Sequence, residues 1–383
     1  MKFYFIIKYQ SEKMMQRDVY KGGIAMRYDA FHPGQVWLDT EGKRIQAHGG
    51  SVMYLKGTYY WYGENKEKTT GKDKIWHWGV RCYTSKDLYN WEDKGLIIEP
   101  RTEDPDSSLH PESMMDRPHI IYNKKTKKFV CWLKIMNQDG TQSETVLTAD
   151  DILGPYTIVR EGLRPLNMSA GDFDLAVAPD GKAYYYFERV HSETICADLT
   201  EDYTDVTGYY STHFPHSHPP HVREATAHFT RKGKHYLITS GTTGYMPNPS
   251  EAAIADTWHG PYTVLGDPHP EDESRTSYHS QISSVFKVEG KKDLYIAVAD
   301  RWAPQEMEVP YETYAKFFDT IFDEELDCEE KEKIMKNLMQ KSTWIPDREK
   351  NTSIADYVWL PFRFDGEMAY LDWKDEWRIE DYE

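Results

Sequence analysis

One sequence pattern recurs five times along this chain of 383 residues and constrains its fold more than any other feature. Each copy opens with a polar residue, continues as a short alternating run, turns, and returns as an aromatic or β-branched run, which is typical of a β-hairpin. Successive openers lie 68, 56, 52 and 57 residues apart, and they are His48, Asp116, Asp172, Glu224 and Gln281. A β repeat of about 50 residues is the signature of a propeller or another closed array.

A second level of repetition supports a propeller and sets its extent. After each hairpin a third strand and a closing phrase follow, and the sequence GPYT occurs at both 154–157 and 260–263. The pattern predicts an all-β, five-bladed β-propeller over residues 25–383, preceded by an N-terminal arm at residues 1–24. Between about 305 and 350 apolar residues recur at helical spacing, which predicts a helical insertion in the last blade.

Charge and composition restrict the partners. The chain has 46 basic and 63 acidic residues, a net charge of −17, which disfavours nucleic acid and anionic membrane surfaces. No run of about 20 apolar residues predicts a membrane span. Tryptophan, tyrosine and phenylalanine (12, 28 and 14 residues) suit strands and also suit stacking on sugars. We therefore expect a neutral oligosaccharide or polysaccharide substrate, with no nucleic acid and no membrane partner.

The N-terminus and the cysteines suggest a location. The five-residue apolar run before Lys8 is shorter than a signal peptide requires. The four cysteines include no CxxC pair, so neither a zinc nor a redox motif is indicated. These features predict a cytoplasmic protein, with secretion as the alternative.

Acidic openers on neighbouring inner strands are the arrangement that glycoside hydrolysis needs. One carboxylic acid protonates the leaving oxygen, and a second group activates water or attacks the sugar. Glu224 is the best candidate for the acid, because a small residue and an alternating strand follow it. Asp172 and Asp116 are the neighbouring carboxylates. Strand alternation would turn Asp174 to the same side as Asp172, so Asp174 is a second candidate at that position.

Other polar residues near the expected axis are candidates for sugar binding. Glu64 and Asn65 end the second strand of the first blade, and the loop at 239–249 carries small hydroxyl residues, two glycines, a tyrosine and an asparagine. Such a loop presents amides and a stacking ring to a ligand, or it is an ordinary connector. The predicted substrate-binding residues are His48, Glu64, Asn65, Asp174, Thr242, Tyr245, Asn248 and His279.

Four histidines crowd the loop that precedes Glu224. They are His213, His216, His218 and His221, and their spacings, interrupted by prolines, match no compact set of zinc ligands. We therefore predict no metal at this loop and no required cofactor. A structural cation such as calcium near the propeller axis remains an open alternative.

Eight phrases of the chain resemble glycoside hydrolase family 43, the five-bladed propeller hydrolases, and more narrowly the exo-β-1,3-galactanase branch. They fall within about 45–302 and 355–375, and they are AHGGSV, YYWYGENK, YTSKDLYNWEDKG, DRPHIIYN, GDFDLAVAPDGKAYY, EATAHFTRKGKHYLITSGTTGYMPNP, YHSQISSVF and YVWLPFRFDG. Together they are much more specific than any one of them alone.

The resemblance implies roles for the openers. Glu224 matches the general acid of the family, and Asp172 matches the aspartate that tunes this acid. In the family an aspartate of the first blade usually serves as the base, but this chain has His48 at that position, and the galactanase branch also lacks the aspartate. In that branch a glutamine that matches Gln281 is thought to assist the attacking water, and a glutamate occupies the position of Asp116. The base is therefore Asp116 or Gln281.

The implied function is an exo-acting, inverting glycoside hydrolase that removes galactose from β-1,3-galactan-type glycans. The shorter side chain of Asp116 keeps a furanosidase for galactofuranose or arabinofuranose as an alternative. The missing first-blade base supports another alternative, an inactive propeller that binds glycans. A WD-type scaffold is disfavoured because no Trp-Asp phrase repeats along the chain.

Overall fold

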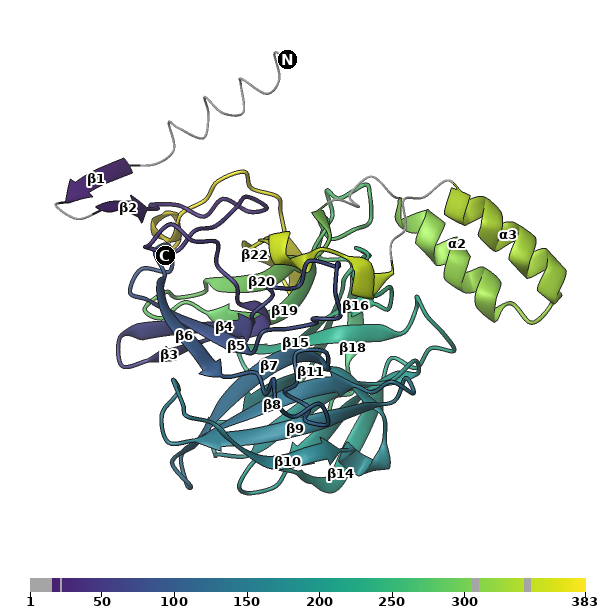
Figure 1. Cartoon of the computed structure of the whole chain (residues 1–383), viewed down its shortest axis with the longest axis horizontal. Helices are drawn as coiled ribbons and strands as arrows, with labels where there is room; N and C mark the ends of the chain where they lie inside the picture. The colour runs from purple at the N-terminus through teal and green to yellow at the C-terminus, as the bar shows by residue number, and fades with distance from the viewer. Residues whose placement is uncertain (1–15, 21–22, 305–309, 341–345) are drawn as a thin grey trace, which may run out of the picture.

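The computed structural model describes residues 16–20, 23–304, 310–340 and 346–383, most of which form a ring of five antiparallel sheets (Figure 1). The first blade comprises β3 (His48–Leu55), β4 (Thr58–Glu64), β5 (Val80–Ser85) and β6 (Glu92–Ile98). The second comprises β7 (Met114–Asn123), β8 (Lys128–Met136), β9 (Gln142–Ala149) and β10 (Thr157–Leu163). The third comprises β11 (Ala170–Val177), β12 (Ala183–Arg189), β13 (Glu193–Leu199) and β14 (Val206–His213). The fourth comprises β15 (Arg223–Arg231), β16 (Lys234–Gly241), β17 (Glu251–Ala255) and β18 (Thr263–Gly266).

The fifth blade closes the ring and carries the insertion. It comprises β19 (Gln281–Lys287), β20 (Tyr295–Arg301), β22 (Leu360–Asp365) and β23 (Met368–Leu371), with β21 (Asp356–Tyr357) paired to β20. The inner strands contact one another in the cyclic order β3, β7, β11, β15, β19, and β19 contacts β3 again. The predicted five-bladed propeller is confirmed.

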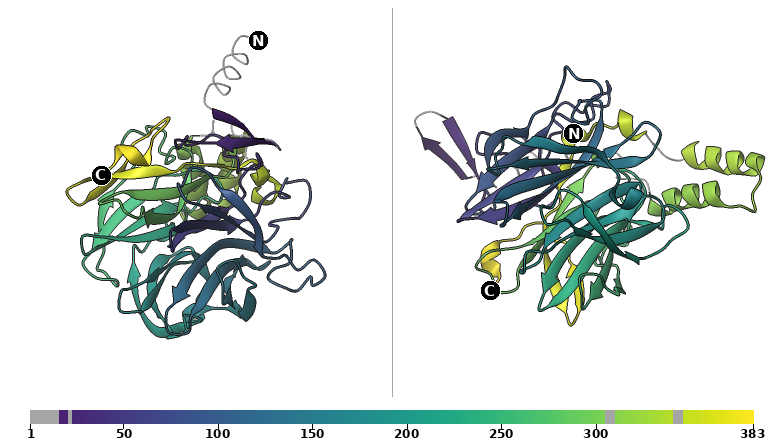
Figure 2. Two further views of the ribbon diagram at one scale, coloured as in Figure 1. Left: turned by 90° about the vertical axis from the view of Figure 1, so that its left-hand side faces the viewer. Right: turned by 90° about the horizontal axis from the view of Figure 1, so that it is seen from below.

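Two helices, α2 (Tyr311–Phe322) and α3 (Cys328–Gln340), lie between β20 and β21 in the chain. They form a hairpin that projects from the propeller, on the opposite side from the strand pair β1–β2 (Figure 2). The predicted helical insertion is therefore confirmed, although its parts at 305–309 and 341–345 lie outside the described residues. Short 3₁₀ helices occur at η1 (Pro165–Asn167), η3 (Asp347–Glu349), η4 (Thr352–Ile354) and η5 (Ile379–Asp381).

The predicted N-terminal arm contains part of a strand pair. β1 (Gln16–Tyr20) and β2 (Gly23–Arg27) form an antiparallel pair, and residues 1–15 and 21–22 lie outside the described part of the chain. No helix among the described residues is long and apolar enough to cross a lipid bilayer.

A β-bulge interrupts every inner strand close to its opening residue. The register with the second strand shifts at His48/Ser51, Asp116/His119, Ala170/Phe173, Glu224/Ala227 and Ile282/Ser284. In three of the strands the residue after the opener has a left-handed backbone, with φ of 59° at Gly49, 54° at Arg117 and 50° at Ala225. A bulge bends the strand and re-aims its side chains. The bulges, rather than simple alternation, therefore set the direction of the openers.

The interface between the first and last blades is a cluster of tryptophans. Trp61 of β4 lies 5.3 Å from Trp91 and 4.6 Å from Trp359 between ring centroids, and all three side chains are fully buried. Aromatic rings of this size remove a large apolar area from water. This cluster therefore stabilises the closure between the first and last blades.

We expect Trp61→Ala to lower the free energy of unfolding by about 3–5 kcal/mol, the usual cost of emptying a buried aromatic site. Urea unfolding monitored by circular dichroism of the backbone, which does not rely on tryptophan fluorescence, measures the change. Tyr209→Ala is the matched control, since Tyr209 is 63% exposed on β14 and its loss should have little effect. Equal stability of wild type and Trp61→Ala would contradict this account of blade closure.

Candidate active site

Residues from all five blades surround one pocket of about 320 Å³. Asp116 of β7, Asp172 of β11, Glu224 of β15 and Gln281 of β19 all line it. The other lining residues are Glu64, Trp76, Met114, Arg117, Lys134, Met136, Gly140, Gln142, Glu188, His191, Thr242, Gly244, Tyr245, Trp302, Phe318 and Asp347. The structure thus brings together the four residues predicted to be catalytic.

Two buried cations connect these side chains across the blades. Lys134 Nζ lies 2.7 Å from Asp172 Oδ1 and 3.3 Å from Asp116 Oδ2. Arg117 Nη2 lies 3.0 Å from Asp172 Oδ2 and donates a hydrogen bond of 2.9 Å to Gln281 Oε1. Each oxygen of Asp172 therefore faces a positive charge.

This pairing keeps Asp172 ionised. Burial by itself would raise the pKa of Asp172, but Arg117 and then Lys134 outweigh it and lower the pKa to about 2. At neutral pH Asp172 is therefore a negatively charged carboxylate.

Glu224 has the opposite environment. Its pKa is raised well above the ordinary glutamate value, first by burial and then by the negative charges of Asp172 and Glu188. Glu224 Oε1 accepts a hydrogen bond of 3.3 Å from Gln281 Nε2. A carboxyl that keeps its proton near neutral pH and points into a pocket can act as a general acid.

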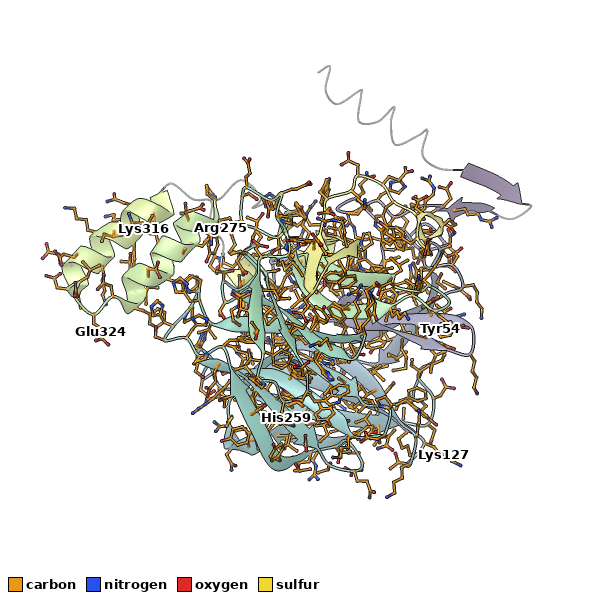
Figure 3. All side chains as sticks on the ribbon, turned by 180° about the vertical axis from the view of Figure 1, so that it is seen from behind. Tyr54, Lys127, His259, Arg275, Lys316 and Glu324 are labelled. Atoms are coloured by element: carbon orange, nitrogen blue, oxygen red, sulfur yellow. The ribbon has the colours of Figure 1, made fainter. Side chains whose placement is uncertain are left out.

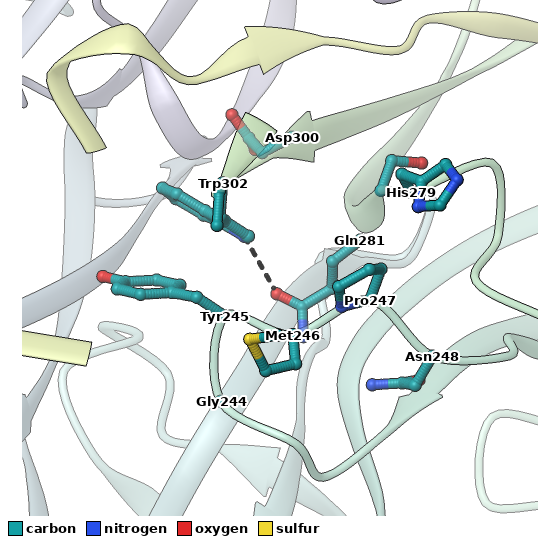
Figure 4. A pocket seen from close by; sticks show the side chains of 11 residues that line it. Gly244, Tyr245, Met246, Pro247, Asn248, His279, Gln281, Asp300 and Trp302 are labelled. Carbon is teal, nitrogen blue, oxygen red and sulfur yellow. Dashed lines mark hydrogen bonds between the residues drawn. The ribbon is translucent and has the colours of Figure 1, made fainter. Parts of the chain in front are cut away.

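The amide of Gln281 has a fixed orientation. Its Oε1 accepts from Arg117 and, at 3.2 Å, from Trp302 Nε1, the contact drawn in Figure 4. Arginine and the indole nitrogen can only donate, so the oxygen of the amide must face them. The Nε2 group then donates to Glu224 and, at 3.0 Å, to Ser240 Oγ. Both lone pairs of Oε1 are thereby occupied.

Lys134 lies between Asp172 and Asp116 and contacts both carboxylates. Asp116 Oδ1 accepts a hydrogen bond of 2.7 Å from Trp76 Nε1 and lies 3.8 Å from Lys66 Nζ. Glu64 is nearby, with Oε2 2.8 Å from Lys66 Nζ and Oε1 accepting from the backbone N–H of Arg117 at 2.9 Å. Burial raises the pKa of Glu64 to about 7 despite the Lys66 charge.

Aromatic rings form one wall of the pocket. The rings of Trp76 and Tyr245 are stacked at 5.6 Å, and Tyr245 lies 5.1 Å from Trp302. Phe318 of α2 also lines the pocket, so the helical insertion contributes to it. Such rings offer flat apolar faces on which the carbon faces of a sugar can pack.

Of the eight residues predicted to bind substrate, Glu64, Thr242 and Tyr245 line the pocket. The other five lie outside its lining and are His48, Asn65, Asp174, Asn248 and His279. The loop at 239–249 therefore does contribute to the pocket, through Thr242 and Tyr245, and is more than a connector.

Two of these five side chains, His48 and Asp174, join neighbouring blades, and that of Asn65 bonds within its own loop. His48 is fully buried, and its Nδ1 lies 2.9 Å from Asp300 Oδ1 on β20. Asp174 lies 2.8 Å from His119 Nδ1 and accepts 2.7 Å from the backbone of His228, which joins three inner strands. The bulge in β11 separates its environment from that of Asp172, so the expected alternation does not hold. Asn65 is buried, and its Oδ1 accepts a hydrogen bond of 3.0 Å from the backbone N–H of Glu67 in its own loop.

The last two lie beside the pocket. Asn248 Oδ1 accepts from Gly241 N at 2.7 Å, and Nδ2 donates to Gly241 O and Thr243, so the side chain clasps its own loop. His279 lines a second cavity of about 10 Å³, which Gln281 and Trp302 also line (Figure 4). Neither side chain contributes to the main pocket.

The sequence did not single out Arg117, Lys134 or Glu188. Arg117 immediately follows an opener, while Lys134 and Glu188 lie near the ends of second strands, positions that could have drawn attention in a propeller. Glu188 is buried, and its pKa is raised to about 7 mainly by burial. A Cβ on Gly171 would lie 2.2 Å from Glu188 Oε2, so a glycine is needed for this carboxylate to approach β11.

A five-bladed propeller with paired carboxyls at its axis is the architecture of a class of sugar-cleaving proteins. The profile of glycosyl hydrolases family 43 matches residues 44–305, more than half of the chain, and the chain belongs to this family.

Similar proteins are consistent with this class. The β-1,3-galactosidase BT0265 has a TM-score of 0.72 and 29% identity, with coverage of 92% of this chain and 64% of that one. BT3683, a β-1,3-galactosidase solved with galactodeoxynojirimycin, has a TM-score of 0.71 and 26% identity, with coverage of 91% and 100%. Xylosidase/arabinosidase 43B of Humicola insolens is 23% identical over 223 residues, 53% of this chain and 38% of that protein. This chain therefore spans less than two-thirds of two of these relatives.

The pKa of Asp172 is lowered and that of Glu224 is raised. Replacing each by its amide should therefore change the free energy of unfolding in opposite directions. Asp172 has a lowered pKa, so its ionised form stabilises the fold above the ordinary aspartate pKa, and this stability is lost as the pH falls toward 2. Asp172→Asn removes the carboxylate that Arg117 and Lys134 share. It should therefore lower the free energy of unfolding by about 3–5 kcal/mol at pH 7, and by less at pH 3.

Glu224 has a raised pKa, so the folded protein resists ionisation and loses stability as the pH rises above the ordinary glutamate value. Glu224→Gln removes this penalty and should raise the free energy of unfolding at pH 8 but not at pH 4. Urea unfolding of both variants across this pH range measures the two effects. Stabilisation by Asp172→Asn, or destabilisation by Glu224→Gln at pH 8, would contradict the assigned environments.

Proposed function

We propose that the protein is an exo-acting, inverting glycoside hydrolase that removes terminal galactose from β-1,3-galactan-type glycans. The observation that carries this proposal is the pair of adjacent carboxyls with pKa values displaced in opposite directions, Asp172 downward and Glu224 upward. Such a pair assigns an acid and a fixed anion within one site. The two β-1,3-galactosidases among the similar structures support galactose as the sugar.

In the proposed reaction Glu224 donates its proton to the glycosidic oxygen as the bond from this oxygen to the anomeric carbon breaks. A water molecule attacks the anomeric carbon from the opposite face, and a base takes its proton. Asp172 stays ionised and keeps Glu224 protonated before each cycle. It also stabilises positive charge that develops on the sugar ring.

The contacts favour Asp116 over Gln281 as the base. Gln281 Oε1 already accepts two hydrogen bonds, so it has no free lone pair for water, whereas its Nε2 orients Glu224. A carboxylate offers about four lone-pair sites, and Asp116 uses its Oδ1 for Trp76 while Oδ2 faces Lys134. We therefore assign Asp116 as the base and Gln281 as the residue that positions the acid.

The pocket wall favours exo action. The stacked rings of Trp76 and Tyr245, together with Phe318 of α2 and Asp347 of η3, surround the carboxyls. A volume of about 320 Å³ is at the small end for ligand pockets and suits the end of a glycan. The terminal sugar would pack on the aromatic rings and present its linkage to Glu224.

A furanosidase is the second candidate. Aspartate is one methylene shorter than glutamate, and a smaller ring with a different position of its anomeric carbon can suit Asp116. The relative from Humicola insolens is named as a xylosidase and arabinosidase, which adds to this alternative. Aryl glycosides of galactopyranose, galactofuranose and arabinofuranose separate the two, since only one ring form should be hydrolysed efficiently.

Glu224→Gln should lower kcat on a β-1,3-linked galactose disaccharide by about 10²–10⁴, the usual contribution of a general acid. The loss should be smaller on an aryl galactoside whose leaving group needs no proton. Glu193→Gln is the matched control, because Glu193 pairs with Arg189 outside the pocket. Release of galactose at the wild-type rate by Glu224→Gln would exclude the assigned acid. Sugar binding without hydrolysis by the wild type would indicate the inactive glycan-binding alternative.

Asp116→Asn should reduce kcat about as much as loss of Glu224, and azide should restore turnover by replacing the activated water. Gln281→Ala should cause a smaller fall and move the alkaline limb of the pH profile, because it removes a donor to Glu224. Proton NMR of the first product formed identifies its anomer, which should be inverted. A retained product would overturn the inverting mechanism, and a larger effect of Gln281→Ala would move the water-activating role to Gln281.

A further inference from the structure

A histidine pair and an aspartate meet where the helical insertion touches the propeller. His218 and His221 lie in the loop between β14 and β15, and Asp319 lies on α2, 98 residues after His221. One possible ligand atom from each lies within 4.8 Å of the others. We propose that these three side chains bind a zinc ion that fastens α2 to the propeller.

The protonation of His218 supports a metal-binding role. His218 Nδ1 lies 2.6 Å from the backbone oxygen of Pro219. A carbonyl oxygen can only accept, so Nδ1 carries the proton and Nε2 keeps its lone pair. Histidine ligands of zinc commonly have this arrangement, in which a hydrogen bond from the other ring nitrogen fixes the tautomer and the ring orientation.

The distance between the donor atoms of His221 and Asp319 is close to that in a zinc site. His221 Nε2 and Asp319 Oδ1 already lie 3.0 Å apart. Bonds of about 2.0–2.1 Å in a tetrahedral zinc site place neighbouring ligand atoms about 3.3 Å apart. The side chains of His221 and Asp319 are about half exposed, so small rotations can bring the three donors to this spacing. Water would occupy the fourth position.

The donor set selects the kind of ion. Two imidazoles and one carboxylate suit zinc and related first-row transition metals. Calcium and magnesium prefer oxygen ligands only, so they fit this group poorly. The spacing of the loop histidines along the sequence does not reveal this group, because the third ligand, Asp319, comes from α2.

The surrounding contacts show what the ion would hold in place. The ring of His218 stacks on Phe322 of α2 at 4.9 Å, and Tyr314 of α2 packs in a buried cluster with Met246. Phe318, the neighbour of Asp319, lines the main pocket. The helical hairpin, marked by Lys316 and Glu324 in Figure 3, otherwise extends away from the propeller. A metal at this contact would therefore fix the part of α2 that forms the pocket wall.

Equilibrium dialysis of the whole, EDTA-treated protein against zinc chloride tests the proposal. We expect one zinc ion per chain for the wild type, and at least a tenfold loss of affinity for both His221→Ala and Asp319→Asn. His216→Gln is the matched control, since His216 lies in the same loop but outside the ligand group, and it should bind as the wild type does. Zinc should raise Tm only in the wild type and the control.

Cobalt tests the geometry independently of stability. Four-coordinate Co²⁺ absorbs visible light strongly, and this band should appear in the wild type and vanish in Asp319→Asn. Absence of zinc binding would overturn the proposal and leave an ordinary hydrogen bond between His221 and Asp319. Equal zinc affinity in the wild type, His221→Ala and Asp319→Asn would also overturn it, because the zinc would then be bound elsewhere.

Discussion

The geometry of the site depends on the contacts that Arg117 makes. Arg117 belongs to the second blade, and its guanidinium pairs with Asp172 of the third blade. The guanidinium also donates to two residues of the fifth blade, to the side chain of Gln281 and, at 3.4 Å, to the backbone oxygen of Ile282. The backbone N–H of Arg117 donates to Glu64 of the first blade. One residue thus connects four blades at the axis. A buried cation is costly unless it is paired, so the positions of its partners are strongly constrained.

This arrangement explains why two carboxyls so close together differ in protonation. Arg117 and Lys134 both face Asp172, whereas Glu224 receives a neutral amide from Gln281. The negative charge held on Asp172 then disfavours a second charge on Glu224. The two cations lower the pKa of Glu224 directly, but burial and the carboxylate that they keep ionised outweigh them and raise it. An always-charged guanidinium suits this task better than a second lysine, because its planar set of donors lets Nη2 reach both Asp172 and Gln281 while Nη1 reaches the backbone of Ile282.

Much of this frame could be predicted from the sequence. The spacing of the openers identified the five blades, and four of the openers line the pocket as expected. His48 does not, because its ring is buried against Asp300 and Tyr357. Alternation could not distinguish Asp172 from Asp174, since a bulge changes the phase of β11 and its position depends on contacts between blades. Lys134 and Glu188 were missed for a similar reason: their roles depend on which neighbouring strands they face.

The pocket wall comes from segments that the repeat does not encode. Asp347 follows the helical insertion and lies against Gly244, where an added Cβ would be 2.3 Å from Asp347 Oδ2. Gly244 also has a left-handed backbone, with φ of 60°, so a side chain there would be both strained and blocked. The loop that carries Tyr245 and the segment after α3 are thus fitted to each other. The blades place the carboxyls at the axis, and the insertion and the segment after it add Phe318 and Asp347 to the pocket lining. Selection among sugars can therefore change through these segments without disturbing the charges at the axis.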